Sequence, residues 1–432
     1  MQNKINVILP EKFDLVKGDL FQLFYRGVVD VPNPSAYDIL SVCEKGRNYP
    51  RYFELMPEEA GEFELKIYVY GPGKELLGEG TTVLRVAEAS SPGRNVNILC
   101  IGDSLTAGGE WVGEAYRRLV NAGGEPFGLG LSNITFVGNC KAGEAGYEAF
   151  GGWRWDSFYS CIHSSMWVEC EHDKDVIDQH SLWHDDRGNL WVLETLEKDR
   201  LKFNRAYLHK GQIPESGEEL KFYQYGTNTA PIKVKRCYEE QNSPFINPAT
   251  GEASFSWYCN ENGIDKLDAV YILLGANGWQ TVYDDGFTTE QSCKWQADMG
   301  KTLVDLIHKD YPDAKVKILG QIGCSVNGGT GTSYGARMPY CDDYGYMHYV
   351  MILNKEYEAW TKEEKYKDFT EFINLSGQID IEYAMPYEIR KVNSRSRQTE
   401  IIGINGAHPS YEGYMQIADA AWRNMVHTVK CE

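Results

Sequence analysis

Residues 95–109 read NVNILCIGDSLTAGG, and this stretch decides the fold that the rest of the chain is expected to adopt. Residues 96–101 are largely apolar, which is typical of a strand buried on both faces of a parallel sheet. Gly102, Asp103 and Ser104 follow at once. Because open α/β sheets place their functional sites at the carboxyl ends of strands, we expect the Ser104 side chain to lie at such an edge.

Similar apolar runs recur at residues 269–274 and 316–319, with helical periodicity between them. The clearest helix has Thr288 and Gln291 at the spacing of a capping box and Pro312 beyond its end. This alternation predicts an α/β fold in three layers, a parallel sheet with helices on both faces. Further helices are expected over residues 347–364 and 410–428.

An N-terminal accessory domain is predicted for residues 1–90. Short stretches there alternate between apolar and polar residues, as in FELKIYVY at residues 63–70, and Gly and Pro separate them. This pattern favours a small antiparallel β-sandwich of immunoglobulin-like type. Residues 87–94 are small or polar and contain Pro-Gly, which indicates a linker, so the α/β domain is assigned to residues 95–432.

Residues 156–262 fit the alternation of strands and helices poorly. They contain an apparent hairpin, residues 190–195 followed by 200–205, and are predicted to form an insertion of β character in the α/β domain. Because insertions of this kind often form the walls of active sites, we expect this one to determine substrate selectivity.

The composition excludes several classes of partner. Of the 432 residues, 42% are apolar and 24% charged, as in an average globular protein large enough for two domains. A net charge of −19 would repel a phosphate backbone, so no nucleic-acid partner is expected. No segment approaches the roughly 20 apolar residues that span a bilayer. The 28 Tyr and 11 Trp residues favour contact with sugar rings, so the expected partner is a small-molecule or glycan ester, and the oligomeric state is not predicted.

The cysteines and the N-terminus suggest a cytoplasmic protein. Eleven cysteines are spread without the spacing of a disulfide scaffold, so reduced thiols are expected. The first residues, MQNKINVILPEKF, lack the features of a secretory signal, and the alternative is a secreted protein whose signal has been removed.

Acidic and histidine residues gather in the predicted insertion, but without the spacing of a metal-binding motif. These residues are His172, Asp173, Asp175, His180, His184, Asp185 and Asp186. No metal and no other cofactor is predicted.

Two residues far apart in the chain are candidates for nucleophilic catalysis. Ser104 is one, although Asp103 and Ser104 could instead simply cap the following helix. His408 lies on a loop rich in Gly and Pro just before the last predicted helix, which can bring it to the end of the first strand. Because His titrates near neutral pH, His408 can take the Ser104 proton and return it to a leaving group.

These segments resemble the GDSL/SGNH hydrolase family of serine esterases, whose sequences carry Ser, Gly, Asn and His in four separated blocks. Ser104 in GDSLTAGG matches the first block, and Gly152 in YEAFGGW matches the second, with Gly151 as the alternative. Asn277 in LGANG matches the third block, and His408 in GINGAHPS matches the fourth.

The resemblance covers about residues 95–430 and implies an SGNH-type α/β fold with esterase activity. It also implies an oxyanion hole made by the backbone N–H groups of Ser104 and Gly152 and the side-chain amide of Asn277. Three preorganised donors of this kind would stabilise the tetrahedral intermediate of acyl transfer. Taken singly, Gly152 would be interpreted as a turn glycine and Asn277 as a helix cap.

Two positions depart from the family pattern. Gly278 stands where the family usually has Asp, so a hydrogen bond that anchors this loop needs a replacement. Asn405 stands where the family has the acid of the triad. Asn is neutral, and with its amide flipped it would favour the wrong tautomer of His408.

Three possibilities remain for His408. A backbone carbonyl orients it in a Ser–His dyad, an acid from elsewhere in the chain reaches it, or the protein binds its ligand without efficient catalysis. A working dyad predicts that Asn405→Ala loses far less activity than His408→Ala.

The first functional hypothesis is therefore hydrolysis of carboxylic esters, with removal of O-acetyl groups from a carbohydrate as the specific reaction. The alternatives are an esterase of the lipase or lysophospholipase type, which would have an apolar rim around its pocket, and a glycan-binding protein of weak catalytic power.

Overall fold

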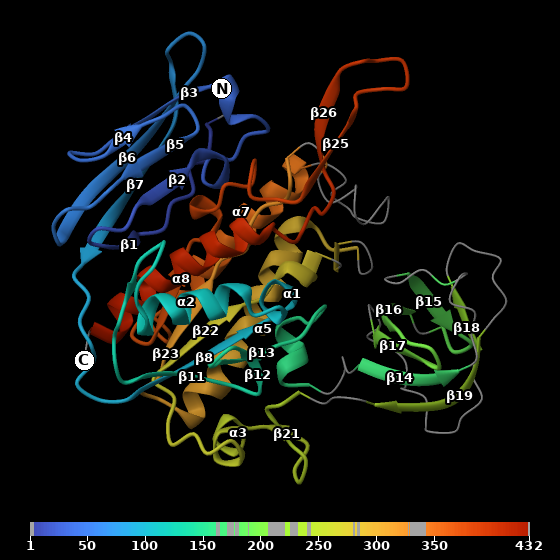
Figure 1. The fold of residues 1–432 in the computed structure, drawn as a ribbon. Helices are drawn as coiled ribbons and strands as arrows, with labels where there is room; N and C mark the ends of the chain where they lie inside the picture. The colour runs from blue at the N-terminus through green and yellow to red at the C-terminus, as the bar shows by residue number, and fades with distance from the viewer. Residues whose placement is uncertain are drawn as a thin grey trace.

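A mostly parallel sheet forms the centre of the molecule in this computed structural model (Figure 1). The strands lie in the order β12-β13-β8-β22-β23-β24, and β11 also pairs with β8. Their bounds are β8 (Val96–Gly102), β11 (Ile134–Val137), β12 (Cys140–Ala142), β13 (Ala145–Ala149), β22 (Ala269–Leu273), β23 (Lys315–Leu319) and β24 (Thr370–Ile373). The structure describes residues 4–160, 165–170, 177, 181–188, 190–205, 221–224, 232–239, 243–279, 281–282, 286–326, 328 and 343–430.

The central strand β8 is buried on both faces, as its apolar sequence predicts. Ile98 and Cys100 belong to one hydrophobic cluster, whereas Leu99 and Ile101 belong to another. Successive side chains of a strand point to opposite faces, so each face of the sheet is covered by a core of its own. The predicted α/β class is confirmed.

Helices supply the residues that cover the sheet. Their bounds are α1 (Ser104–Ala107), α2 (Glu110–Val120), α3 (Phe255–Glu261), α5 (Thr289–Asp310), α7 (Asp343–Thr361) and α8 (Tyr411–Lys430). Helix α2 packs on α8, and α5 packs on α7. The predicted capping box of Thr288 and Gln291 is present at the start of α5. Helix α7 begins four residues earlier than the sequence predicts and ends three residues earlier.

The N-terminal part consists of two sheets around a shared core. The bounds are β1 (Lys12–Val16), β2 (Phe21–Phe24), β3 (Asp38–Val42), β4 (Arg47–Asn48), β5 (Tyr52–Leu55), β6 (Gly61–Tyr70) and β7 (Leu76–Ala87). One sheet has the order β1-β7-β6-β3 and the other β2-β5-β4. The expected sheets were antiparallel, but β1 pairs in parallel with β7. Side chains of both sheets meet in one hydrophobic cluster.

The segment predicted as an insertion contains a closed barrel of short strands, drawn in green in Figure 1. The bounds are β14 (Ser165–Cys170), β15 (Leu182–Asp185), β16 (Leu190–Leu196), β17 (Arg200–Arg205), β18 (Lys221–Gln224) and β19 (Ile232–Glu239). The predicted hairpin is the antiparallel pair β16–β17. Helix α3 also falls in the predicted range, but its residues Phe255 and Tyr258 are buried in the core of the central sheet.

Shorter elements connect these units. They are β9 (Ala122–Gly123), β10 (Gly128–Leu129), β20 (Ile246–Asn247), β21 (Glu252–Ala253), β25 (Tyr387–Lys391), β26 (Thr399–Gly403) and the 3₁₀ turns η1 (Tyr25–Gly27), η2 (Pro34–Ala36), η3 (Trp155–Phe158), η6 (Ala276–Trp279) and η8 (Ser376–Gln378). The hairpin β25–β26 projects from the body of the molecule (Figure 1).

Other expectations concern cysteines, metals and membranes. Free thiols in the described residues are Cys43, Cys100, Cys140, Cys170, Cys259, Cys293 and Cys324.

Of the acidic and histidine residues singled out in the insertion, His172, Asp173, Asp175 and His180 lie outside the described residues. Among the residues that are described, no group of three His, Cys, Asp or Glu side chains is arranged to hold a metal. None of the described helices combines the length and apolar character needed to cross a membrane.

Candidate active site

Ser104 lies at the carboxyl end of β8, as its sequence position predicts. The strand ends at Gly102, where a Cβ atom would lie 2.0 Å from Thr106 Oγ1, so only glycine fits this sharp turn. Asp103 caps helix α1 by accepting a hydrogen bond from Leu105 N at 3.0 Å. The capping interpretation is therefore correct for Asp103, whereas the Ser104 hydroxyl has a different partner.

That partner is His408. Its Nε2 atom lies 2.8 Å from Ser104 Oγ, although the two residues are 304 positions apart in the chain. His408 lies on the loop between β26 and α8, and both side chains are half-buried. The structure thus brings the two predicted catalytic residues into hydrogen-bonding distance.

Asn405 occupies the position of the missing acid and faces the other nitrogen of the imidazole. Its Oδ1 atom lies 3.3 Å from His408 Nδ1. The same oxygen accepts hydrogen bonds from the backbone N–H groups of Ala407 at 3.1 Å and His408 at 3.0 Å.

These backbone contacts fix the orientation of the Asn405 amide. Two N–H donors require an acceptor, so the oxygen must point toward them and the NH₂ group must point away. The nitrogen that faces this oxygen, His408 Nδ1, then carries the proton, and Nε2 is left to accept from the Ser104 hydroxyl. The flipped amide, which would favour the wrong tautomer of His408, is therefore not the orientation found here, because the two backbone N–H groups need the oxygen.

Asn277 connects three of the four sequence blocks. It lies in η6, just after β22, and its Nδ2 atom donates to Trp153 O at 2.9 Å and to Asp103 Oδ2 at 3.3 Å. Trp153 directly follows Gly152, whose φ of +77° belongs to the left-handed region that favours glycine. Gly152 is exposed in a turn closed by the hydrogen bond from Trp153 N to Phe150 O.

The loop that carries Asn277 is anchored without the Asp that the family has after it. The carbonyl of Gly278 accepts hydrogen bonds from the hydroxyls of Thr281 at 2.9 Å and Ser292 at 3.2 Å. A Cβ atom at Gly278 would lie 1.9 Å from Cδ of Gln296, a residue buried in helix α5. The space that an Asp side chain would need is therefore filled, and two hydroxyl groups hold the loop instead.

Asp103 is a buried carboxyl next to Ser104. Burial raises its pKa to about 7, and hydrogen bonds from backbone N–H groups oppose this only in part. Sequence reasoning treated Asp103 as a helix cap and missed its contact with Asn277. The contact of Asn277 with Trp153 was not predicted either. Its acceptor is the backbone carbonyl, which every residue has, so the residue type at position 153 does not indicate it.

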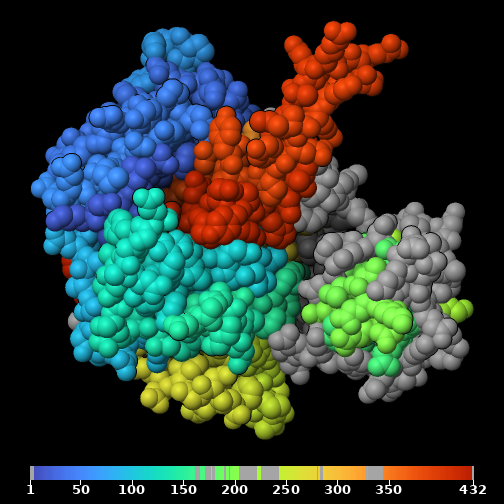
Figure 2. Space-filling model, viewed as in Figure 1, coloured from blue at the N-terminus to red at the C-terminus, as the bar shows by residue number. Residues whose placement is uncertain are grey.

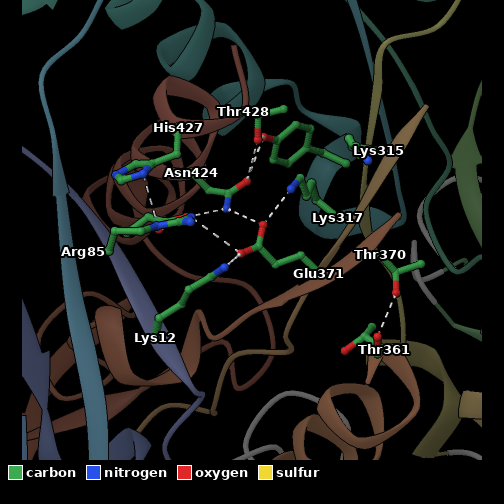
Figure 3. A network of polar contacts seen from close by, with 12 residues as sticks. Lys12, Arg85, Lys315, Lys317, Thr361, Thr370, Glu371, Asn424, His427 and Thr428 are labelled. Carbon is green, nitrogen blue, oxygen red and sulfur yellow. Dashed lines mark hydrogen bonds and ion pairs between the residues drawn. The ribbon is translucent and has the colours of Figure 1, made fainter. Parts of the chain in front are cut away.

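A cavity of about 670 Å³ lies away from these residues. Val96, Ala269, Lys315 and Thr370, at the amino ends of four central strands, contribute to its lining, so it opens at the edge opposite to Ser104. Figure 3 shows that several of its polar groups, among them Lys12, Lys317 and Glu371, are paired with one another.

Glu371 lies at the centre of this paired network. It contacts Lys12 at 2.8 Å and Lys317 at 2.6 Å, and the two ammonium groups hold its pKa well below the ordinary value. We assign this network to the attachment of β1 to the central sheet.

Comparison with known proteins gives only distant similarity. No family model matches the chain, and no curated protein sequence matches it. A carbohydrate acetylesterase family member from Sinorhizobium meliloti has 12% identity and a TM-score of 0.36, over 78% of this chain and 99% of its own. A family 3 carbohydrate esterase from Talaromyces cellulolyticus has the same values. A family 2 carbohydrate esterase with a carbohydrate-binding domain, from Corynascus thermopiles, has 12% identity and a TM-score of 0.33, over 99% of this chain and 100% of its own. Scores this low establish no activity for this chain, so its function has to be inferred from the site itself.

Proposed function

We propose that this protein is a serine esterase that hydrolyses carboxylic esters, with Ser104 as nucleophile and His408 as general base. The observation that carries the proposal is the 2.8 Å contact between Ser104 Oγ and His408 Nε2 at the carboxyl end of a parallel strand. An imidazole in this position, with its Nδ1 proton directed to Asn405, can accept the serine proton as the hydroxyl attacks.

The proposed reaction has two halves. In the first, Ser104 Oγ forms a bond to the ester carbonyl carbon, the bond to the alcohol oxygen breaks, and His408 transfers the serine proton to the departing alcohol. In the second, water attacks the acyl-enzyme, His408 takes a proton from this water, and the proton returns to Ser104 as the acid leaves.

The oxyanion of each tetrahedral intermediate needs donors close to Ser104. The proposed donors are the backbone N–H groups of Ser104 and Gly152 and the Nδ2 group of Asn277. Both hydrogens of Asn277 Nδ2 have acceptors, Trp153 O at 2.9 Å and Asp103 Oδ2 at 3.3 Å. We therefore propose that the longer bond, to Asp103, is exchanged for the oxyanion when the intermediate forms.

O-acetyl groups on a carbohydrate are the proposed substrate class. An aromatic content of 13%, with 28 Tyr residues, suits stacking on sugar rings. Hydrolysis of p-nitrophenyl acetate with little activity on p-nitrophenyl palmitate supports an acetylesterase. The opposite preference would favour an esterase of the lipase type.

Covalent labelling tests the nucleophile directly. A fluorophosphonate probe is expected to label the wild-type protein, not Ser104→Ala, and only weakly His408→Ala. Ser410→Ala is the matched control, because this nearby hydroxyl contacts Glu412 and not the imidazole. If the wild-type protein is folded by circular dichroism but is neither labelled nor active, the protein is a binding protein and not an esterase.

A further inference from the structure

Three tyrosines near His408 are unusually exposed. The exposed fractions are 66% for Tyr383, 55% for Tyr387 and 67% for Tyr411. Tyrosine is amphipathic and in most positions buries much of its ring, so a group of such residues beside a candidate active site indicates a contact surface.

The backbone brings these residues together at the His408 loop. Ser410 N donates to Ala384 O at 2.9 Å, which joins the segment of Tyr383 to the start of α8 and Tyr411. Tyr387 pairs with Gly403 at the base of the β25–β26 hairpin, five positions before His408. The three tyrosines therefore lie on segments that are joined through the backbone to the loop of the proposed general base, and we call Tyr383, Tyr387 and Tyr411 the tyrosine rim.

Tyr383 is held in position by the N-terminal part of the chain. The guanidinium group of Arg51 lies over its ring, 4.6 Å from the centroid. Arg51 is itself held by two carboxylates, Asp380 and Glu382, and Arg26 also binds Glu382 at 2.9 Å. One face of the Tyr383 ring is thus covered by an ordered cation, while the ring as a whole stays 66% exposed.

The β25–β26 hairpin, which carries Tyr387, projects from the body of the molecule (Figures 1 and 2). Ile389 and Ile401 are cross-strand partners, 65% and 48% exposed, on the same face as Tyr387. Gly403, opposite Tyr387, places no side chain against its ring. An exposed apolar strip therefore runs along one face of the hairpin from Tyr387.

We propose that the tyrosine rim is a stacking surface for a carbohydrate chain, so that the natural substrate is an oligosaccharide or polysaccharide and not a single sugar. This rests on the proposed esterase function. The C–H faces of sugar rings pack on aromatic faces, and a ring already ordered by Arg51 loses little conformational entropy on binding. A glycan that carries the ester brings it to Ser104, whereas a second copy of the chain docked on the tyrosine rim would cover the site.

Kinetics on two substrates test the proposal. The variants are Tyr383→Ala, Tyr387→Ala and Tyr411→Ala, assayed on acetylated xylan and on p-nitrophenyl acetate. Each is expected to raise KM on acetylated xylan about two- to tenfold with kcat unchanged, since an aromatic pair contributes about 0.5–1.5 kcal/mol. Activity on p-nitrophenyl acetate should be unchanged, because this substrate carries no sugar chain to stack on the tyrosine rim.

Conservative variants separate stacking from general damage. The corresponding Tyr→Phe variants keep the aromatic face and should retain the wild-type KM on acetylated xylan. Tyr68→Ala, in β6 of the N-terminal sheet, is the control for loss of a surface ring elsewhere. Arg51→Lys keeps the charge but not the planar group over Tyr383, so it should raise KM as Tyr383→Ala does, with no further rise in the double variant.

Two outcomes would overturn the proposal while leaving the esterase intact. One is a triple Tyr→Ala variant with wild-type KM on acetylated xylan and normal activity on p-nitrophenyl acetate. The other is a dimer of the wild type, measured by light scattering, that the triple variant does not form. The tyrosine rim would then bind a second copy of the chain and not a glycan. If the wild type does not hydrolyse p-nitrophenyl acetate, the proposed esterase function is contradicted and not the tyrosine rim. Binding of the Ser104→Ala variant to immobilised xylan then still tests the tyrosine rim.

Discussion

At the scale of single residues, the main finding concerns Asn405. The resemblance in sequence places neutral Asn405 where GDSL/SGNH hydrolases have an acid, which by itself suggests a defective site. In the structure, two backbone N–H groups hold the amide oxygen toward His408 Nδ1. In the proposed mechanism Asn405 therefore orients His408 as an acid would, but lacks the charge of an acid.

Asn405→Asp is expected to raise kcat. A carboxylate would keep the hydrogen bonds to the backbone and would also stabilise the imidazolium that forms during turnover. The reverse change in serine proteases lowers turnover about 10⁴-fold, so we expect a gain of at least roughly tenfold here. The measurement is kcat on p-nitrophenyl acetate across pH, with Asn405→Leu as a control that should lose activity. An unchanged kcat in Asn405→Asp would show that the imidazolium needs no counter-charge in this site.

Asp103→Asn should change how stability depends on pH. The pKa of an unfolded Asp is about 3.9, whereas burial raises the pKa of Asp103 to about 7 in the folded protein. Between these values the folded protein holds a proton that the unfolded chain has released. Protonated Asp103 therefore contributes to the free energy of unfolding in full below about pH 4. This contribution is lost as the pH rises through about 7, where the folded protein also releases the proton.

Thermal unfolding at pH 5, 6.5 and 8 measures this effect. We expect the Tm of the wild type to fall relative to that of Asp103→Asn as the pH rises, because the variant side chain does not titrate. A Tm difference that is the same at all three pH values would contradict the raised pKa.

At the scale of elements, strand order explains why distant sequence blocks meet. Strands β13, β8 and β22 are neighbours, and β8 pairs in parallel with both others. Their carboxyl ends therefore lie side by side, and the segments that follow them contribute Trp153, Asp103 and Asn277. The apolar runs of β8 and β22 predicted where these two strands end. Strand β13 was not predicted from the sequence, because it is short and contains Gly and Glu.

Gly278→Ala is expected to destabilise the loop after β22. The new Cβ would lie 1.9 Å from Cδ of buried Gln296, and forcing extra atoms into a packed region typically costs about 1–3 kcal/mol. Urea unfolding measures the loss, and kcat should fall because Asn277 moves with the loop. Gly93→Ala, where no atom lies within 4 Å of the added Cβ, is the matched control. Equal stability of the two variants would mean that Gln296 moves aside freely.

At the scale of the whole molecule, a buried ion cluster joins the N-terminal part to helices α2 and α8, which follow Ser104 and His408 in the chain. Asp19, from the connection between β1 and β2, contacts Arg118 of α2 and Arg423 of α8, both at 2.6 Å. Arg118 is fully buried and also lies 3.6 Å from the centroid of the Trp422 ring. The N-terminal part is thus attached through charges that are almost fully buried.

Asp19→Ala is expected to destabilise the protein strongly. It would leave two buried arginines without this carboxylate, and breaking a buried pair typically costs about 3–5 kcal/mol. The free energy of unfolding in guanidinium chloride is the measurement, and the exposed pair Lys17–Glu88 supplies the control. Lys17→Ala should change stability by no more than about 1 kcal/mol. A comparable small change in Asp19→Ala would show that the N-terminal part is held mainly by other contacts.

The sequence by itself determined the local features. The apolar run of β8, the capping box of α5 and the four separated blocks placed Ser104 and His408 as the catalytic candidates, because each signal lies within a few neighbouring residues. The division into an accessory domain and an insertion, and the role of Asn277 and Gly152 as donors, stay predictions.

Only the tertiary structure decided how those candidates are held. The orientation of the Asn405 amide, the contact of Asn277 with Asp103 and Trp153, and the space closed by Gln296 depend on which atoms face one another after packing. A hydrogen bond is set by distance and direction over a few ångströms, and residues far apart in the chain acquire that geometry only when the whole core has formed.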